Sequence, residues 1–433
     1  MIVTMSNSNG VLTLFLEIED DDNLEPTTKY SMNEKQVTTV FPAEIDIDSI
    51  HPDHLALAIM MIVNPFVGNR LILPKGMSKQ FFEKFRSLTS RYEFGPIDET
   101  LKPWTGNENS RPGLAFSGGV DSTAALSLMP PTTALVFLDR PLKSKSLYRK
   151  DAAHKACLEI SNLGFDLHMI VCDLEYVRNP VGFPVDVANS VPIVLMAGYL
   201  NLDCIGFGTI LESTYGTGHR KARDYPNGNH FRFWGGLFEA AGLPFILPAA
   251  GISEVGTSII VTKSPLGEYS QSCMRGEWKK PCLSCWKCFR KQILDWAIIA
   301  ANPSKHELGN LFDNLEALKY VSEVPIKHEN VLTWSTNKLN FDDNLFKLLK
   351  SRVRGDSLSL DFLSKWYSPS LDIIPEKYQK CVREKILKYL DIMNAEEERE
   401  IENWSMVEFI ALPGTELASE KLSKLMNEKI KSR

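Results

Sequence analysis

Arg111-Pro-Gly-Leu-Ala-Phe-Ser-Gly-Gly-Val-Asp-Ser-Thr-Ala-Ala-Leu126 is the stretch of sequence that decides the fold. Its apolar residues 114–116 predict a buried strand, the serine and glycines that follow predict a sharp turn, and residues 120–129 have helical composition. A strand, a glycine turn and a helix in this order aim backbone N–H groups and a helix N-terminus at an anion. Glycine is needed at the turn because a side chain there would keep the ligand's oxygens away from the backbone.

The residues of this turn are candidates for binding the phosphates of a nucleotide. Asp121 lies in the first turn of the predicted helix, where we expect it to hold Mg²⁺ against the phosphates. The turn is neither a Walker loop nor a dinucleotide-binding loop, since GxxxxGK[ST] and GxGxxG do not occur here. The bland alternative is a glycine turn capped by serine and aspartate. The candidate ATP-binding residues are Phe116, Ser117, Gly118, Gly119, Val120, Asp121 and Ser122, with Asp121 and Ser117 also candidates for catalysis.

From Gly113 onward, predicted strands alternate with predicted helices. This alternation predicts an α/β fold, a parallel sheet with helices on both faces. The further strands are expected at 134–138, 167–172, 204–208 and 244–247, and the further helices at 148–163, 191–200 and 231–241.

Ligands of such sheets bind at the carboxyl ends of the strands. Asp139 and Glu212 each follow a predicted strand, and we expect them to contact nucleotide, metal or substrate, with a simple turn residue as the alternative reading. The departing pyrophosphate also needs cations, because the glycine turn has no lysine of its own. The basic segment 212–224 offers Arg220, Lys221 and Arg223, unless it is only a solvated loop.

The predicted elements divide the chain into three regions. Residues 1–105 are expected to form an N-terminal α/β module with strands at 11–18, 36–41 and 70–73 and helices at 52–63 and 79–88. Residues 106–300 form the nucleotide-binding core, and residues 301–433 form a mostly helical region. Its helices are expected at 308–320, 345–353, 375–393 and 416–430.

Composition limits the classes of partner. With 44% hydrophobic and 24% charged residues, the 433-residue chain is typical of soluble globular proteins. Its net charge of −6 gives no general attraction to nucleic acid, so a nucleic-acid partner is possible but not favoured. The longest apolar stretches, 55–63 and 191–200, are too short to cross a bilayer, and no signal pattern stands at residues 1–10. We expect a cytoplasmic protein without a membrane partner.

Four of the eight cysteines are crowded into residues 273–288. Cys273, Cys282, Cys285 and Cys288 have the spacing C-x8-C-x2-C-x2-C, which predicts a closed, structural Zn²⁺ site. An iron–sulfur cluster uses the same ligands and is the alternative. Arg290 and Lys291 follow at once, and we expect them to offset the negative charge of the thiolates.

The motif Ser-Gly-Gly-Val-Asp-Ser at 117–122 resembles the PP-loop of the ATP pyrophosphatases, which split ATP between its α and β phosphates. Together with the four cysteines, with Gly242-Leu-Pro-Phe-Ile-Leu-Pro248 and with Ser253-Glu254-Val255, it resembles the 7-cyano-7-deazaguanine synthase family of the queuosine pathway (QueC). The resemblance covers residues 111–297. That family usually has a lysine beside its Ser-Glu word, and none stands at 251–255. It is also smaller; enlarged relatives occur in bacterial anti-phage defence systems.

The resemblance implies an ATP-dependent ligase that adenylates the carboxylate of 7-carboxy-7-deazaguanine, or of a similar deazapurine acid, and releases pyrophosphate. Ammonia then gives an amide and a nitrile, or a protein amine gives a conjugate. It implies that Ser117, Gly118, Gly119, Asp121 and Ser122 hold the pyrophosphate and that the four cysteines bind zinc. Two alternatives stay open: a PP-loop enzyme that modifies tRNA, as in thiolation, and a non-catalytic module that binds a partner through the flanking regions.

Overall fold

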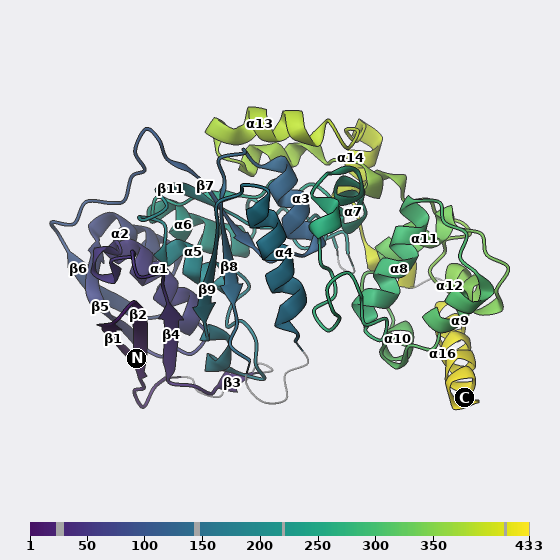
Figure 1. Cartoon of the computed structure of the whole chain (residues 1–433), viewed down its shortest axis with the longest axis horizontal. Coiled ribbons are helices and arrows are strands. Elements are labelled where there is room, and N and C mark those ends of the chain that lie inside the picture. Colours follow the sequence, from purple (N-terminus) through teal and green to yellow (C-terminus); the bar gives the residue numbers. More distant parts are fainter. Residues whose placement is uncertain (23–29, 143–147, 219–220, 411–413, 433) are drawn as a thin grey trace.

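A computed structural model describes residues 1–22, 30–142, 148–218, 221–410 and 414–432. The fold is α/β, with a mostly parallel ten-stranded sheet in the order β12-β11-β7-β8-β9-β4-β2-β1-β5-β6. Figure 1 shows the N-terminal strands and the C-terminal helices at opposite sides of the molecule, with the parallel strands between them.

The predicted nucleotide-binding core supplies five parallel strands. They are β7 (Arg111–Phe116), β8 (Ala134–Asp139), β9 (Leu167–Cys172), β11 (Leu202–Gly206) and β12 (Phe245–Ile246). From β7 the chain first adds β8 and β9 on one side and then returns to add β11 and β12 on the other. The strand order therefore reverses between β7 and β11, and in open α/β sheets ligands bind at such a reversal, beyond the carboxyl ends of the strands.

The N-terminal strands continue this sheet rather than forming one of their own. They are β1 (Ile2–Ser8), β2 (Val11–Glu17), β4 (Gln36–Val40), β5 (Arg70–Ser78) and β6 (Glu93–Asp98). Strand β4 pairs antiparallel with β9, through Thr39 opposite Cys172 and Val40 opposite Val171. The predicted boundary near residue 105 thus does not divide the sheet. A separate two-stranded sheet pairs β3 (Ser31–Met32) with β10 (Arg178–Asn179).

Helices cover both faces, because the parallel strands alternate their side chains between two cores. Leu114 and Phe116 pack on one side with α3 (Val120–Leu128), α4 (Lys150–Asn162) and α7 (Glu254–Lys263). Ala115 packs on the other side, in the core that contains α1 (Pro52–Val63), α2 (Lys79–Leu88), α5 (Val191–Leu195) and α6 (Gly236–Ala240). Burial on both faces explains why these strands read as continuous apolar runs.

A third core joins helices of the C-terminal region to α8 (Trp286–Ile298). This core includes Phe289 and Ile293 of α8. Helix α8 therefore packs with residues beyond 301, although it lies before the boundary that the sequence predicts at residue 300. The other helices are α9 (Lys305–Leu311), α10 (Leu315–Val321), α11 (Glu329–Lys338), α12 (Asn344–Arg352), α13 (Glu376–Ile386), α14 (Ala395–Glu402), α15 (Met406–Ile410) and α16 (Thr415–Lys431).

Helix α13 returns to the sheet, at the end where β7 and β11 begin (Figure 1). The hydroxyl of Tyr378 donates to Asp203 at 2.7 Å, and Lys377 donates to the Ser110 carbonyl at 2.9 Å. The glycine turn lies at the opposite end of β7, so α13 does not cover it. Short helical turns (residues 47–49, 174–177, 188–190, 231–235, 267–269, 361–364 and 368–373) complete the described elements. No helix among them is long and apolar enough to cross a membrane.

Several predicted helices end elsewhere than expected. The helix predicted at 308–320 is two helices, because Asn314 accepts a hydrogen bond from the Ala317 N–H and begins α10. The helix predicted at 191–200 ends at Leu195. The helix predicted at 375–393 ends at Ile386, and residues 391–393 instead bond to the backbone of Trp366.

Candidate functional site

The glycine turn lies at the carboxyl end of β7, directly before α3. Gly118 has φ of +71°, in the left-handed region that glycine adopts without strain. Gly119 stands at the N-cap of α3 and offers no side chain to accept the first N–H groups of the helix. The hydroxyl of Ser122 donates to the Gly119 carbonyl at 3.1 Å and lies 3.0 Å from the Ser117 hydroxyl. The serines thus fix the turn, while the N–H groups of the first helical turn stay available to an anion.

The loop after β11 lies against this turn. A Cβ on Gly208 would lie 2.7 Å from the Ser122 nitrogen and 2.8 Å from the Asp121 carbonyl carbon. Two stretches from either side of the strand reversal therefore meet at the start of α3, and only glycine allows this approach.

Asp121 is oriented by a neighbouring helix. Its Oδ1 accepts a hydrogen bond from the buried Thr257 hydroxyl at 2.8 Å. Ser127 and Ser264, near the other ends of α3 and α7, also share a hydrogen bond, at 3.0 Å. The two helices therefore run side by side in the same direction, and α7 holds the Asp121 carboxylate at the turn.

A buried charge cluster lies at the start of α7, one helical turn from Thr257. Glu254 Oε1 lies 2.8 Å from Arg290 and 3.0 Å from Lys291, and its Oε2 lies 3.4 Å from His328. Burial alone would raise the pKa of Glu254, but these cations outweigh it and hold the pKa well below its usual value. Arg290 and Lys291 therefore pair with Glu254, and their expected effect on the thiolate charge stays a prediction.

Glu212 adjoins this cluster, in the loop after β11. Its two oxygens accept the Glu254 N–H at 3.2 and 3.1 Å, and Oε1 also accepts from the Asn330 amide at 3.1 Å. Burial, and then the negative charge of Glu254, raise the pKa of Glu212 to about 8. Near neutral pH the two carboxyl groups thus hold one negative charge, on Glu254. A carboxyl group with a pKa near the working pH is suited to proton transfer.

Asp139 lies at the end of β8, as predicted, but its carboxylate already has partners. It lies 2.7 Å from Lys150 and 3.0 Å from His154, both on α4. Arg140 beside it pairs with Glu175 at 3.1 Å. These residues stabilise the end of β8, and both contacts of Asp139 are made by its Oδ1 atom.

The predicted basic segment is not brought to the glycine turn where it is described. Arg220 lies outside the described residues, as does His219. Lys221 forms an isolated bridge with Ser405. Arg223 lines a cavity of about 1160 Å³ beside Tyr215 and Phe245, whose lining includes none of residues 117–122.

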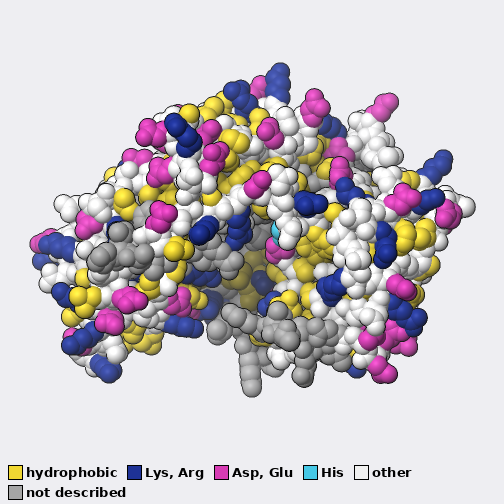
Figure 2. All heavy atoms as spheres, turned by 180° about the vertical axis from the view of Figure 1, so that it is seen from behind, with side chains coloured by type: hydrophobic (Ala, Val, Ile, Leu, Met, Phe, Trp, Pro, Cys, Tyr) yellow, Lys and Arg dark blue, Asp and Glu magenta, His cyan; other side chains and the backbone are white. Residues whose placement is uncertain are grey.

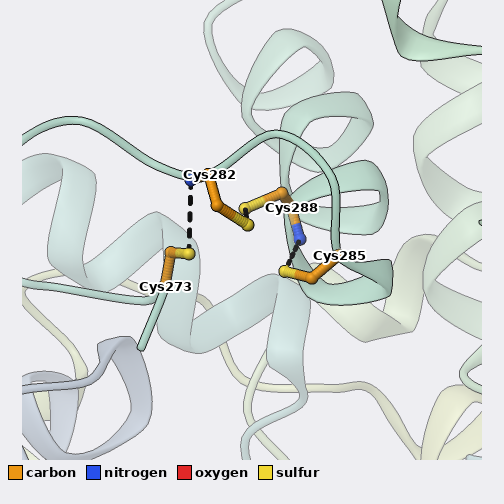
Figure 3. Close-up of side chains that lie close together, drawn as sticks. All are labelled: Cys273, Cys282, Cys285 and Cys288. Carbon is orange, nitrogen blue, oxygen red and sulfur yellow. Dashed lines mark hydrogen bonds between the residues drawn. The ribbon is translucent and has the colours of Figure 1, made fainter. Parts of the chain in front are cut away.

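The four predicted metal ligands come together (Figure 3). All four sulfur atoms lie within 4.8 Å of one another, and the Sγ atoms of Cys282 and Cys288 are 3.8 Å apart. Zn–S bonds of about 2.3 Å in a tetrahedron place sulfurs about 3.8 Å apart. The hydrogen bond from Cys288 lowers the pKa of Cys285 to about 5, while the pKa of Cys288 rises because it keeps the shared proton. The cluster is therefore suited to binding a metal ion such as zinc.

Residues far along the chain support this cluster. The Asn314 amide donates to the Cys285 carbonyl at 3.1 Å, and Glu316 accepts from the Trp286 N–H at 3.1 Å. Glu316 also pairs with Arg275, and Glu316 and then the negative charges of Cys285 and Cys282 raise the pKa of Arg275. Arg275 thus supplies positive charge near the sulfurs.

Two cavities flank the glycine turn. One, of about 200 Å³, is lined by Phe116 and Ser117 at the end of β7 and by Leu138 and Arg140 at the end of β8. The other, of about 670 Å³, is lined by Val120 and by residues of α7 and α8. Gln271 and Cys273 line both cavities, so the metal-binding loop passes between them. Figure 2 shows that the face opposite that of Figure 1 is hollowed near its middle, with Lys and Arg side chains gathered around the hollow.

Sequence reasoning missed Lys287 of α8, the pairing of Arg290 and Lys291 with Glu254, and the hydrogen bond from Thr257 to Asp121. The sequence shows that basic residues stand among and after the cysteines at 285–291. It does not show which way these basic side chains point, because that depends on how α8 packs against α7.

Comparisons with known proteins add one family. Residues 233–405, less than half of the chain, match the model of a family of unknown function, DUF6395. The match includes the four cysteines and α7 but not the glycine turn. No curated protein matches the sequence. No solved structure matches the fold. The chain is thus similar to this family of unknown function over the part that runs from α6 to α14.

Proposed function

We propose that the protein is an ATP-dependent ligase that adenylates a carboxylic acid and passes the activated acyl group to an amine. The substrate is 7-carboxy-7-deazaguanine or a similar deazapurine acid. The amine is ammonia or a protein amine, and the proposed biological setting is anti-phage defence. One observation carries the proposal: an uncapped glycine turn stands at the strand reversal of a parallel sheet, with a cavity on each side.

The smaller cavity and the glycine turn suit the two parts of ATP, the base and the phosphates. The smaller one has the apolar walls of Phe116, Phe137 and Leu138, with Arg140 at its rim, and suits a flat base. The turn N–H groups and the start of α3 suit the β and γ phosphates. Asp121, held by Thr257, holds Mg²⁺ in this arrangement.

Adenylation needs little proton transfer by the protein, because the attacking group is a carboxylate that is already ionised. A carboxylate oxygen of the substrate attacks the α-phosphorus, the bond between this phosphorus and the bridging oxygen to the β-phosphorus breaks, and pyrophosphate leaves with Mg²⁺. The protein contributes in-line positioning and charge neutralisation. In the second step the amine attacks the acyl carbon, the bond from this carbon to the AMP oxygen breaks, and AMP leaves. Glu212 accepts the amine's proton in its ionised form, whose share grows as the pH approaches 8.

Zinc is the ion that this proposal assigns to Cys273, Cys282, Cys285 and Cys288. A cluster of several irons would hold its cysteine sulfurs farther apart than a single ion does, and the 3.8 Å separation suits a single ion. Four thiolates leave no open position, so the ion holds the loop and takes no part in the reaction.

The test is to incubate the protein with ATP, Mg²⁺ and 7-carboxy-7-deazaguanine and to follow AMP and the deazaguanine by mass spectrometry. We expect AMP together with an adenylate, and an amide or nitrile once ammonia is added. AMP without any change in the deazaguanine would point to another acid. Absence of ATP binding would overturn the proposal.

A pair of variants separates the glycine turn from general effects on the fold. Asp121→Asn should abolish AMP formation, because the carboxylate that holds Mg²⁺ is lost. Asp151→Asn makes the same substitution in the first turn of α4, where the side chain is exposed, and should leave the rate unchanged. Equal rates in both variants would contradict a role for Asp121.

A further inference from the structure

Helix α8 brings a cation to the glycine turn that the turn itself lacks. Lys287 lies in the first turn of α8 and lines the cavity of about 670 Å³ together with Val120 of the turn. Lys287 and the start of α3 therefore border the same cavity.

The other cations of α8 are already neutralised. Arg290 and Lys291 both pair with Glu254, and Lys291 also donates to the Ser258 hydroxyl at 2.9 Å. Lys287 has no ion pair and no hydrogen bond from its ammonium group to any residue in the described parts of the chain. A half-buried ammonium group without a partner costs free energy, because it has lost water without gaining an anion.

A second polar group near the turn also lacks a partner. Thr123 is fully buried in the first turn of α3, and its hydroxyl has no hydrogen-bond partner within the residues that the structure describes. The Thr123 hydroxyl and the Lys287 ammonium group are thus two polar groups near the start of α3 without a partner among the described residues.

We infer that Lys287 binds the pyrophosphate part of the nucleotide, from the cavity side of the glycine turn. The inference rests on the proposed function and names the cation that neutralises the leaving group. Since Asp121 and Lys287 lie on opposite helices, Mg²⁺ and the ammonium group would approach the phosphates from two directions. Such pairing of a metal ion and a lysine suits a leaving group that carries several negative charges.

The position of Lys287 also links the anion site to the cysteine cluster. Cys285 is the N-cap of α8 and Cys288 lies in its first turn, so Lys287 stands between two metal ligands. A metal ion that fixes these cysteines fixes the backbone of Lys287 as well.

The experiment measures binding of inorganic pyrophosphate, with Mg²⁺, to the full chain by titration calorimetry, and binding of ATP beside it. Lys287→Gln should weaken pyrophosphate binding about tenfold to hundredfold, the range for a hydrogen bond to a charged group. Lys287→Arg should restore most of it. Lys279→Gln is the matched control, because Lys279 lines the same cavity but pairs with Glu268 on the exposed surface.

A measurement on the unaltered protein covers the case in which Lys287→Gln does not fold. Limited acetylation followed by mass spectrometry should show that pyrophosphate protects Lys287 and leaves Lys279 reactive. If the protein binds ATP but neither the variant nor the acetylation distinguishes Lys287 from Lys279, the inference is overturned while the proposed function stands. If the protein binds neither ATP nor pyrophosphate, the proposed function fails with it.

Discussion

The hydroxyl of Thr257 donates to Oδ1 of Asp121 across 2.8 Å, and this hydrogen bond joins α7 to the first turn of α3. Thr257 is fully buried and Asp121 is partly buried. The bond connects the charge cluster around Glu254 to the glycine turn, since Glu254 and Thr257 are neighbours on one helix face. The orientation of Asp121 is therefore set from outside the motif that contains it.

Replacing Thr257 by valine should weaken binding of Mg²⁺ and ATP about fivefold, because a hydrogen bond of about 1 kcal/mol no longer orients the carboxylate. Titration calorimetry at several Mg²⁺ concentrations measures this. The control is Thr262→Val, also on α7, whose hydroxyl donates to the Ser258 carbonyl of its own helix at 2.9 Å. Equal affinities in the two variants would show that Thr257 does not orient Asp121.

Replacing Gly208 by alanine should abolish ATP binding, since the new Cβ would lie 2.7 Å from the Ser122 nitrogen and push the start of α3 away. Binding of a fluorescent ATP analogue checks this, and circular dichroism verifies that the variant is folded. At Gly309, in α9, the nearest atom to an added Cβ is the end of Lys429 at 3.9 Å. Gly309→Ala should bind ATP normally and gain about 0.5–1 kcal/mol of stability. Normal ATP binding by the Gly208 variant would contradict the close approach.

The stability of the protein should depend on pH through Glu212. The pKa of this group rises from 4.5 to about 8 on folding, so the folded state binds more protons than the unfolded state between these values. The free energy of unfolding should therefore fall as pH rises from 4.5 to 8, by at most about 1.4 kcal/mol per pH unit from this group. Urea unfolding of the protein and of Glu212→Gln, compared across pH 5–9, isolates the effect because all other groups cancel in the difference. A difference that does not change with pH would exclude the raised pKa.

Loss of the metal should disturb ATP binding as well as the fold. The Gln271 N–H donates to the Gly118 carbonyl at 2.6 Å, so the loop that carries Cys273 also holds the glycine turn. Cys285→Ser should lose the zinc measured by elemental analysis, lower the unfolding temperature and weaken ATP binding. Cys381→Ser, in the partly exposed thiol outside the cluster, should keep all three properties. Zinc content of about one ion per chain in both variants would contradict the assignment of Cys285.

Local sequence predicted most of the fold because its signals were local. Helices α1 and α2 and strand β9 have the predicted bounds, since each is a long apolar or amphipathic run between turn residues. Strand β1 was missed because Ser6, Asn7 and Ser8 are polar and exposed, and β6 because glycine and proline interrupt it. Helix ends set by capping or by a distant partner, as at Asn314 and Trp366, could not be predicted from periodicity.

The parts of the candidate site that form a short sequence pattern could be predicted. The parts that come from different helices and meet only in the folded protein could not. Residues 117–122 and the four cysteines are recognisable as short patterns, and the structure places each as a compact group. Thr257, Arg290 and Lys287 have ordinary helical contexts, and only the packing of α3, α7 and α8 makes them neighbours of Asp121 and Glu254. The pairing of Arg290 and Lys291 with Glu254 could not be predicted, because the direction of a helical side chain depends on which face its neighbours cover.

The pairing of β4 with β9 has a consequence for how the protein can be divided. A protein cut at residue 105 would lack β4, so the end of β9 at Val171 and Cys172 would lose its partner on that side, while β8 would still pair with β9 on the other. An exposed strand edge can pair with a strand of another chain, so we expect the shortened protein to aggregate. The N-terminal strands therefore also shield this edge of the five parallel strands from pairing with other chains.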